Sequence, residues 1–182
     1  LSALVISSLI NSILNEEQKK TFLGKKELDL SCELSKIARF RVNLFWEKGN
    51  ISMVARLISG ILPTMEEIML PPIVYELTKL NSGLIIITGP AGCGKSTTLA
   101  AFLNYINQTR PLNIVTLEDP VEYIFTPDKS AIVQRELGRD MLSFKEGLKH
   151  VLRQDPNVIM VGEMRDLETV ALALTLAETG HL

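Results

Sequence analysis

The residues with the clearest chemistry form a glycine-rich segment, Gly89-Pro90-Ala91-Gly92-Cys93-Gly94-Lys95-Ser96. It matches the pattern G-x-x-x-x-G-K-[ST], in which glycines let successive backbone N–H groups converge on a phosphate. Lys95 would reach the β- and γ-phosphates of a nucleoside triphosphate, and the Ser96 hydroxyl would be a ligand of its Mg²⁺. We therefore predict a nucleotide-binding segment from Gly89 to Thr97. The alternative is a glycine-rich turn that binds nothing.

A carboxylate follows an apolar run further along the chain. Glu163 comes directly after the run 157–161 and Gly162, at the point where a buried strand would end. Many phosphate-loop enzymes have an Asp at this place, which holds Mg²⁺ through water, and a Glu next to it that activates the attacking water. Here the Asp is absent, so we expect Glu163 to polarise water as the general base. The alternative is an exposed Glu at the end of a strand.

A second group of carboxylates follows the apolar run 113–117. Glu118 and Asp119 come directly before Pro120, and Glu122 lies a little further on. The carboxyl ends of parallel strands share one edge of a sheet, and open α/β sheets bind their ligands there. We expect Glu118 or Asp119 to take over the outer coordination of Mg²⁺, with Glu122 as a more distant option. The alternative is that they only solvate a turn.

Arginines gather in the N-terminal third of the chain. Runs that alternate apolar and polar residues at 27–34, 40–46 and 51–57 predict an antiparallel meander with one solvent-facing side, and a turn is expected at Ser35-Lys36. The solvent-facing side would carry Arg39, Arg41 and Arg56. On the residues alone, these arginines solvate the open side of a sheet.

The remaining patterns predict the elements that must position these side chains. Strands are expected at 84–88, 113–117, 123–125, 132–133 and 157–161, and helices at 1–22, 73–80, 97–106, 143–153 and 166–179. Because strands and helices alternate after residue 83, we predict an α/β fold with a mostly parallel sheet. The segment 62–72, rich in Pro, is expected to be a linker between an N-terminal domain, 1–61, and a domain at 73–182.

The last predicted helix carries no charge between Val170 and Ala177, so it needs cover on several faces. We therefore expect part of the sheet to be missing and the chain to be a fragment of a longer protein, incomplete at its C-terminus.

Composition excludes several classes of protein. The chain has 182 residues, 46% of them apolar, and its 19 basic and 21 acidic residues give a net charge of −2. That charge disfavours a nucleic-acid partner. Its two cysteines, Cys32 and Cys93, have no metal-site spacing, which fits a reducing compartment. The apolar runs are too short or too interrupted to span a bilayer. We expect a cytoplasmic protein whose contact with a membrane is made through partners.

Several motifs together carry a resemblance to a known family. Besides residues 89–96, these are Thr116-Leu117-Glu118-Asp119-Pro120-Val121-Glu122-Tyr123, the segment 155–166, and Glu178-Thr179-Gly180-His181-Leu182. They resemble the phosphate loop, Asp box, Walker B segment and start of the His box of secretion-superfamily ATPases. Val133-Gln134-Arg135-Glu136-Leu137-Gly138 and the segment 162–169 are similar to the twitching-motility PilT branch, the retraction motors of type IV pili.

This resemblance implies a homo-hexameric ring that hydrolyses ATP, with Mg²⁺, to drive pilin disassembly on an inner-membrane pilus platform protein. Each subunit would pair a PAS-like N-terminal domain with a RecA-like motor domain. The resemblance assigns Glu163 as the catalytic glutamate, Glu118 and Asp119 as Asp-box carboxylates, and His181 as a His-box histidine. It also implies that Arg41 and Arg56 approach the nucleotide phosphates from the N-terminal domain.

The chain departs from the family pattern at two places. Cys93 stands where the family usually has Ser, a position that works through its backbone N–H, and the sequence stops before the second His-box histidine. Three other functions remain open. They are an assembly or secretion ATPase of the same superfamily, a nucleotide-binding module without hydrolysis, and a RecA-like nucleic-acid translocase. Glu163 and Lys95 argue against the second, and the net charge argues against the third.

Overall fold

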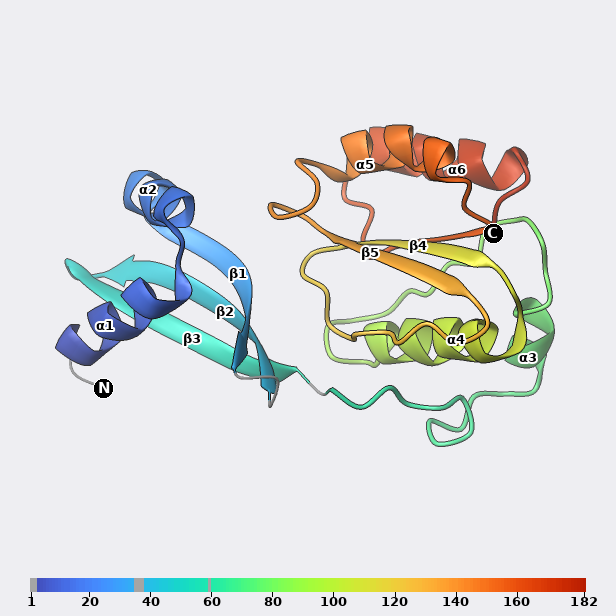
Figure 1. Cartoon of the computed structure of the whole chain (residues 1–182), viewed down its shortest axis with the longest axis horizontal. Coiled ribbons are helices and arrows are strands. Elements are labelled where there is room, and N and C mark those ends of the chain that lie inside the picture. The colour runs from blue at the N-terminus through green and yellow to red at the C-terminus, as the bar shows by residue number, and fades with distance from the viewer. Residues whose placement is uncertain (1–2, 35–37, 59) are drawn as a thin grey trace. The chain divides into compact units, whose positions relative to one another are not determined.

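The computed structural model describes residues 3–34, 38–58 and 60–182 and divides the chain into two compact units, 1–60 and 61–182 (Figure 1). The predicted turn at Ser35-Lys36 lies outside the described residues. No helix in the described ranges is both long enough and apolar enough to cross a bilayer.

The N-terminal unit contains an antiparallel sheet of three strands in the order β1-β2-β3, which confirms the predicted meander. The strands are β1 (Glu27–Leu34), β2 (Ala38–Glu47) and β3 (Asn50–Ile58). Helices α1 (Ala3–Ile13) and α2 (Glu16–Lys25) bury Ile10 and Phe22 against one face of the sheet, where Leu30, Val42 and Leu44 point. The opposite face is therefore free to carry polar side chains.

The prediction of one helix over residues 1–22 is wrong, because the helix is interrupted between α1 and α2. Asn15 starts the second helix with a capping box. Its side chain accepts a hydrogen bond from the Gln18 N–H at 2.8 Å, and the Gln18 side chain accepts one from the Asn15 N–H at 3.0 Å. This reciprocal pair satisfies N–H groups that a helix start leaves without partners, so a new helix begins there.

The second unit is built on a parallel sheet in the order β5-β4-β6, which confirms the predicted α/β architecture. Its strands are β4 (Asn113–Glu118), β5 (Ala131–Glu136) and β6 (Val158–Val161). Its helices are α3 (Ile73–Leu77), α4 (Lys95–Thr109), α5 (Phe144–Val151) and α6 (Leu167–Glu178), and a short 3₁₀ turn, η1 (Leu152–Gln154), follows α5.

Helices cover both faces of this sheet, with α4 on one side and α5 and α6 on the other (Figure 1). The central strand β4 sends Ile114 toward Phe102 and Ile106 of α4. Its next residue, Val115, packs toward Leu148 of α5 on the other side. Alternate residues of β4 are thus buried on opposite faces, and the strand is fixed between two cores.

The predicted strand 84–88 is not formed. Among the described residues no strand pairs with it; residues 83–89 and 158–164 instead line a cavity of about 370 Å³. A run of apolar residues becomes a strand only when a neighbour supplies hydrogen-bond partners. The C-terminal Leu182 bonds to Asn157 and Ile159 at β6, and the His181 carbonyl accepts from Gly83 N–H at 3.0 Å. These contacts lie at the Gly83 end of the segment.

Candidate nucleotide-binding site

The glycine-rich loop has the geometry that phosphate binding needs. Gly92 and Gly94 have φ values of 78° and 96°, which residues with a side chain rarely adopt. The 15-residue helix α4 starts directly after the loop, at Lys95, so its positive end points toward the loop. Residues 89–93 are exposed. The loop can therefore offer backbone N–H groups to a phosphate that approaches from solvent.

Two side chains of the loop helix already have partners. The Lys95 ammonium donates to the Gly89 and Pro90 carbonyls at 3.0 and 2.9 Å, which draws the loop around it. The Thr97 hydroxyl lies 3.2 Å from the Tyr123 hydroxyl. Thr97 thus connects α4 to the segment between β4 and β5, whereas Ser96 is left facing the pocket described next.

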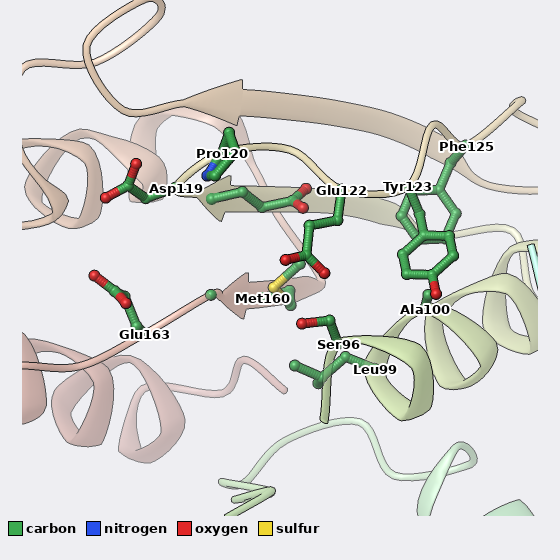
Figure 2. Close-up of a pocket in the computed structure, with 12 residues that line it drawn as sticks. Ser96, Leu99, Ala100, Asp119, Pro120, Glu122, Tyr123, Phe125, Met160 and Glu163 are labelled. Atoms are coloured by element: carbon green, nitrogen blue, oxygen red, sulfur yellow. The ribbon is translucent and has the colours of Figure 1, made fainter. Parts of the chain in front are cut away.

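A pocket next to Ser96 is lined by the four predicted carboxylates, Glu118, Asp119, Glu122 and Glu163. In Figure 2 the Glu122 carboxylate and the Ser96 hydroxyl lie on facing sides of this pocket, with Asp119 and Glu163 further along the strand ends. No Lys or Arg is among its lining residues in the described chain. The structure therefore brings together the residues predicted from two separate strand ends and one loop.

Close backbone contact between two strands explains why Gly stands at position 162. The Gly162 N–H donates to the Leu117 carbonyl at 2.8 Å. A Cβ at 162 would lie 3.2 Å from that carbonyl oxygen and 3.4 Å from the Glu118 Cα. A side chain such as Asp would require the neighbouring backbone to shift by a few tenths of an ångström. The missing side chain thus allows the ends of β4 and β6, and with them Glu118 and Glu163, to share one edge.

Glu118 is buried, with 7% of its surface exposed, and its position is fixed by hydrogen bonds. The Thr116 hydroxyl donates to its Oε1 at 2.5 Å, and the Gln134 side-chain amide donates to the same oxygen at 3.1 Å. Burial raises the pKa of the Glu118 carboxyl, and these hydrogen bonds partly offset the rise. A cation in the pocket would favour the charged form.

Glu163 has a more open environment at the end of β6. Its Oε1 lies 2.7 Å from the Arg165 Nε, and 30% of the Glu163 side chain is exposed against 75% for Arg165.

Three residues later Asp166 caps α6, accepting hydrogen bonds from the Thr169 N–H and hydroxyl at 2.8 and 2.9 Å. The first of these bonds is the main reason that the pKa of Asp166 is lowered.

The chemistry of the pocket fits a divalent cation that arrives with a nucleotide. Carboxylate and hydroxyl oxygens are the ligands that Mg²⁺ prefers. The pocket encloses about 70 Å³, more than the roughly 10–15 Å³ that one water needs. Within the described ranges, no three His, Cys, Asp or Glu side chains converge into a metal site of their own. Ser96 would hold Mg²⁺ directly, and Glu118 and Asp119 would hold it through water.

Comparisons with known proteins show which family the chain belongs to. The model of the type II/IV secretion system protein family matches residues 66–182. The chain belongs to this family. A twitching motility protein of Neisseria gonorrhoeae is 47% identical over all 182 residues and 49% of its own length. A type IV pilus retraction ATPase, PilT, of Pseudomonas aeruginosa is 47% identical over 97% of this chain and 52% of its length.

A solved structure gives the same result for the fold of this secretion-family chain. The crystal structure of the pilus retraction motor PilT with bound ADP superposes with a TM-score of 0.93 at 44% identity. The match covers 97% of this chain and 51% of the PilT chain. The chain therefore has the α/β fold of a phosphate-loop secretion ATPase, and it spans about half the length of the relatives it matches.

Among the residues predicted as catalytic, His181 belongs to the same unit as the carboxylate pocket but does not line it. His181, half-buried, places its Nδ1 3.1 Å from the Leu176 carbonyl. Arg41 and Arg56 are opposite each other on β2 and β3, in the N-terminal unit. The predicted arginine face is thus present as a pair on neighbouring strands. The approach of these arginines to a nucleotide stays a prediction.

Thr116 and Gln134 both contact Glu118, and neither was predicted as a site residue. They are register partners on β4 and β5, so their side chains emerge on the same face. The available signal was a polar residue inside an apolar strand, as in Val115-Thr116-Leu117. Residues 123–125, predicted as a strand, form none; the Phe125 N–H donates to the Gln134 side chain at 3.0 Å instead of to a ladder.

Proposed function

We propose that this chain is part of an ATP-hydrolysing motor that retracts type IV pili. The observation that carries the proposal is the arrangement around Ser96, where the phosphate loop adjoins a pocket lined by four carboxylates and no basic residue. A nucleotide phosphate could sit beside these carboxylates only with a cation between them. The names of the two pilus relatives support retraction as the work that is coupled to hydrolysis.

Each group in the site has a proposed task. The amides of residues 89–94 and the Lys95 ammonium hold the phosphates, which requires Lys95 to exchange the carbonyls of Gly89 and Pro90 for phosphate oxygens. Bound Mg²⁺ would neutralise charge on the β- and γ-phosphates. Glu163 accepts a proton from the attacking water, for which its partial exposure and single ion pair leave it accessible.

The motor would act as a homo-hexamer in the cytoplasm, on a platform protein of the inner membrane. We place Arg41 and Arg56 of the N-terminal unit near the phosphates, in the same subunit or in a neighbour, and His181 in the same catalytic machinery. Neither nucleic acid nor insertion into the bilayer is part of this proposal.

The proposal is tested first by nucleotide binding. Lys95→Ala removes a charge-assisted contact worth about 2–4 kcal/mol, so the Kd for Mg·ATP measured by calorimetry should rise by at least about 30-fold. Lys129→Ala, an exposed lysine of the same unit, is the matched control and should leave the Kd unchanged. Equal affinity in wild type and Lys95→Ala would show that the nucleotide site lies elsewhere.

A cellular experiment separates retraction from assembly. A host that produces only the Lys95→Ala form should lose twitching motility but keep surface pili, because disassembly stops while assembly continues. Loss of the pili themselves would instead favour an assembly motor.

A further inference from the structure

Gln134 lies on β5, the strand next to β4, and its side chain reaches Glu118 at the end of β4. Its Nε2 donates to the Glu118 Oε1 at 3.1 Å and to the Tyr123 carbonyl at 2.8 Å, and its Oε1 accepts from the Phe125 N–H at 3.0 Å. These partners fix the orientation of the amide, because an N–H must face the oxygen end and two acceptors must face the nitrogen end. Both N–H donors and the oxygen acceptor of the Gln134 amide therefore have partners.

The carboxamide joins three points that the backbone of β4 does not hold by itself. One is the carboxylate at the end of β4, and the other two belong to the loop that follows it. Thr116, the register partner of Gln134, donates to the same oxygen of Glu118. Two donors from neighbouring strands thus converge on one carboxylate oxygen. The terminal torsion of a Glu is otherwise soft, so this pair of bonds fixes the plane of the carboxylate.

The loop keeps other anchors that do not involve Gln134. The Glu136 carboxylate accepts from the Val121 N–H at 3.0 Å. Asn107 of α4 accepts from the Asp128 N–H at 3.0 Å and donates to the Thr126 carbonyl at 2.9 Å. The path of the loop is therefore held at both ends without Gln134. Gln134 connects the Tyr123 carbonyl and the Phe125 N–H of the loop to Glu118, which also receives a backbone hydrogen bond from Glu122.

We infer that Gln134 is a positioning residue, which orients Glu118 toward the Mg²⁺ of a nucleotide bound at Ser96. The inference rests on the proposed nucleotide site and adds a residue that does not itself touch the cation. Groups that hold a metal-binding carboxylate in place typically change metal affinity by about 10–100-fold when they are removed. A residue that only braced the loop would affect the site with and without Mg²⁺ alike.

The test compares nucleotide affinity with and without Mg²⁺. The Kd of the slowly hydrolysed analogue ATPγS is measured by calorimetry in Mg²⁺ and in EDTA, and the ratio of the two values gives the magnesium effect. Gln134→Met, which keeps length but makes no hydrogen bonds, should reduce the magnesium effect about 10-fold and leave the Kd in EDTA within about twofold. Gln108→Met, at an exposed position of α4, is the matched control and should change neither value.

A double-mutant cycle shows whether Gln134 acts through Glu118. Glu118→Gln should also reduce the magnesium effect, and adding Gln134→Met to it should reduce the effect no further. If the two substitutions reduce the magnesium effect additively, the inference is wrong. It is also wrong if Gln134→Met keeps the wild-type ratio of Kd values, or if it loses affinity equally in Mg²⁺ and in EDTA. If Gln134→Met does not fold, Gln134→Glu takes its place, because it keeps the size and the acceptor for the Phe125 N–H.

The outcomes separate this inference from the function on which it rests. A wild-type chain that binds no ATPγS in either buffer overturns the proposed nucleotide site and the inference with it. A wild-type chain that binds with a magnesium effect which Gln134→Met retains overturns the inference alone.

Discussion

Two glutamates stand at the same edge of one sheet and have opposite environments. Glu118, at the end of β4, is buried and held by side chains of two strands. Glu163, beyond the end of β6, is partly exposed and pairs with a solvent-exposed Arg165. A carboxylate that coordinates a cation through water needs a fixed position, whereas one that accepts a proton must be able to move toward water. Two carboxylates at neighbouring strand ends can therefore take different roles, because different side chains contact them.

The largest expected effect concerns the more open glutamate. Glu163→Gln keeps size but cannot accept a proton as a carboxylate does, so ATP turnover should fall by roughly 10² to 10⁴ in a phosphate-release assay. The Kd for ATP should stay within a few-fold, because Lys95 and the loop amides are unchanged. If Glu118→Gln abolished turnover and Glu163→Gln left it at the wild-type rate, the two roles would have to be exchanged.

The next effect tests whether the β4 side is as tightly fixed as its contacts indicate. Thr116→Val is nearly isosteric but removes a donor from the buried Glu118, and a buried polar group that loses a partner costs about 1–3 kcal/mol. Urea denaturation should show the free energy of unfolding reduced by this amount. Thr109→Val, at an exposed helix end, should change it by less than about 0.5 kcal/mol. If both substitutions lowered the free energy of unfolding equally, the burial of Glu118 would contribute nothing to the cost of the lost hydrogen bond.

On the β6 side, Asp166 caps helix α6, and its effect on thermal stability is smaller and depends on pH. The pKa of Asp166 is lowered in the folded chain from 3.8, so its charge stabilises the fold above that pH and the contribution is lost as pH falls through the lower folded value. Asp166→Asn keeps a cap but no charge. Its Tm at pH 7 should be about 2–4 °C below wild type, and the gap should close below pH 3.8. A gap that persists in acid would assign the effect to packing.

The smallest effect is expected for the ion pair of Glu163. Arg165 is three-quarters exposed, and surface ion pairs contribute less than about 1 kcal/mol. Arg165→Met should therefore leave the free energy of unfolding within that range and turnover within about fivefold. A loss as large as that of Glu163→Gln would show that the pair is part of the reaction, and the contrast between the two strand ends would then be wrong.

The sequence was sufficient for the parts of the site that follow from apolar runs. The run before Glu118 and the run before Glu163 both form strands, and the carboxylates meet at one edge because parallel strands end together. Thr116 and Gln134 received no role because their partner lies across a strand pairing, and sequence periodicity does not give register. The failed strand 84–88 has a similar origin, since an apolar run does not specify its neighbour.

The N-terminal helix break shows the opposite case. Asn15 and Gln18 have the spacing of a capping box, so the boundary between α1 and α2 was present in the local sequence. The apolar periodicity ends at Leu14 and a charged run, Glu16 to Lys20, follows it, so the prediction joined the two into one helix and missed the cap.

The central place of β4 in its sheet determines how firmly the carboxylate edge is held. β4 lies between β5 and β6 and is bonded to both, so its backbone opens only when the unit unfolds. The carboxylate edge is therefore held in place, and the sheet serves as the fixed reference against which a phosphate is received.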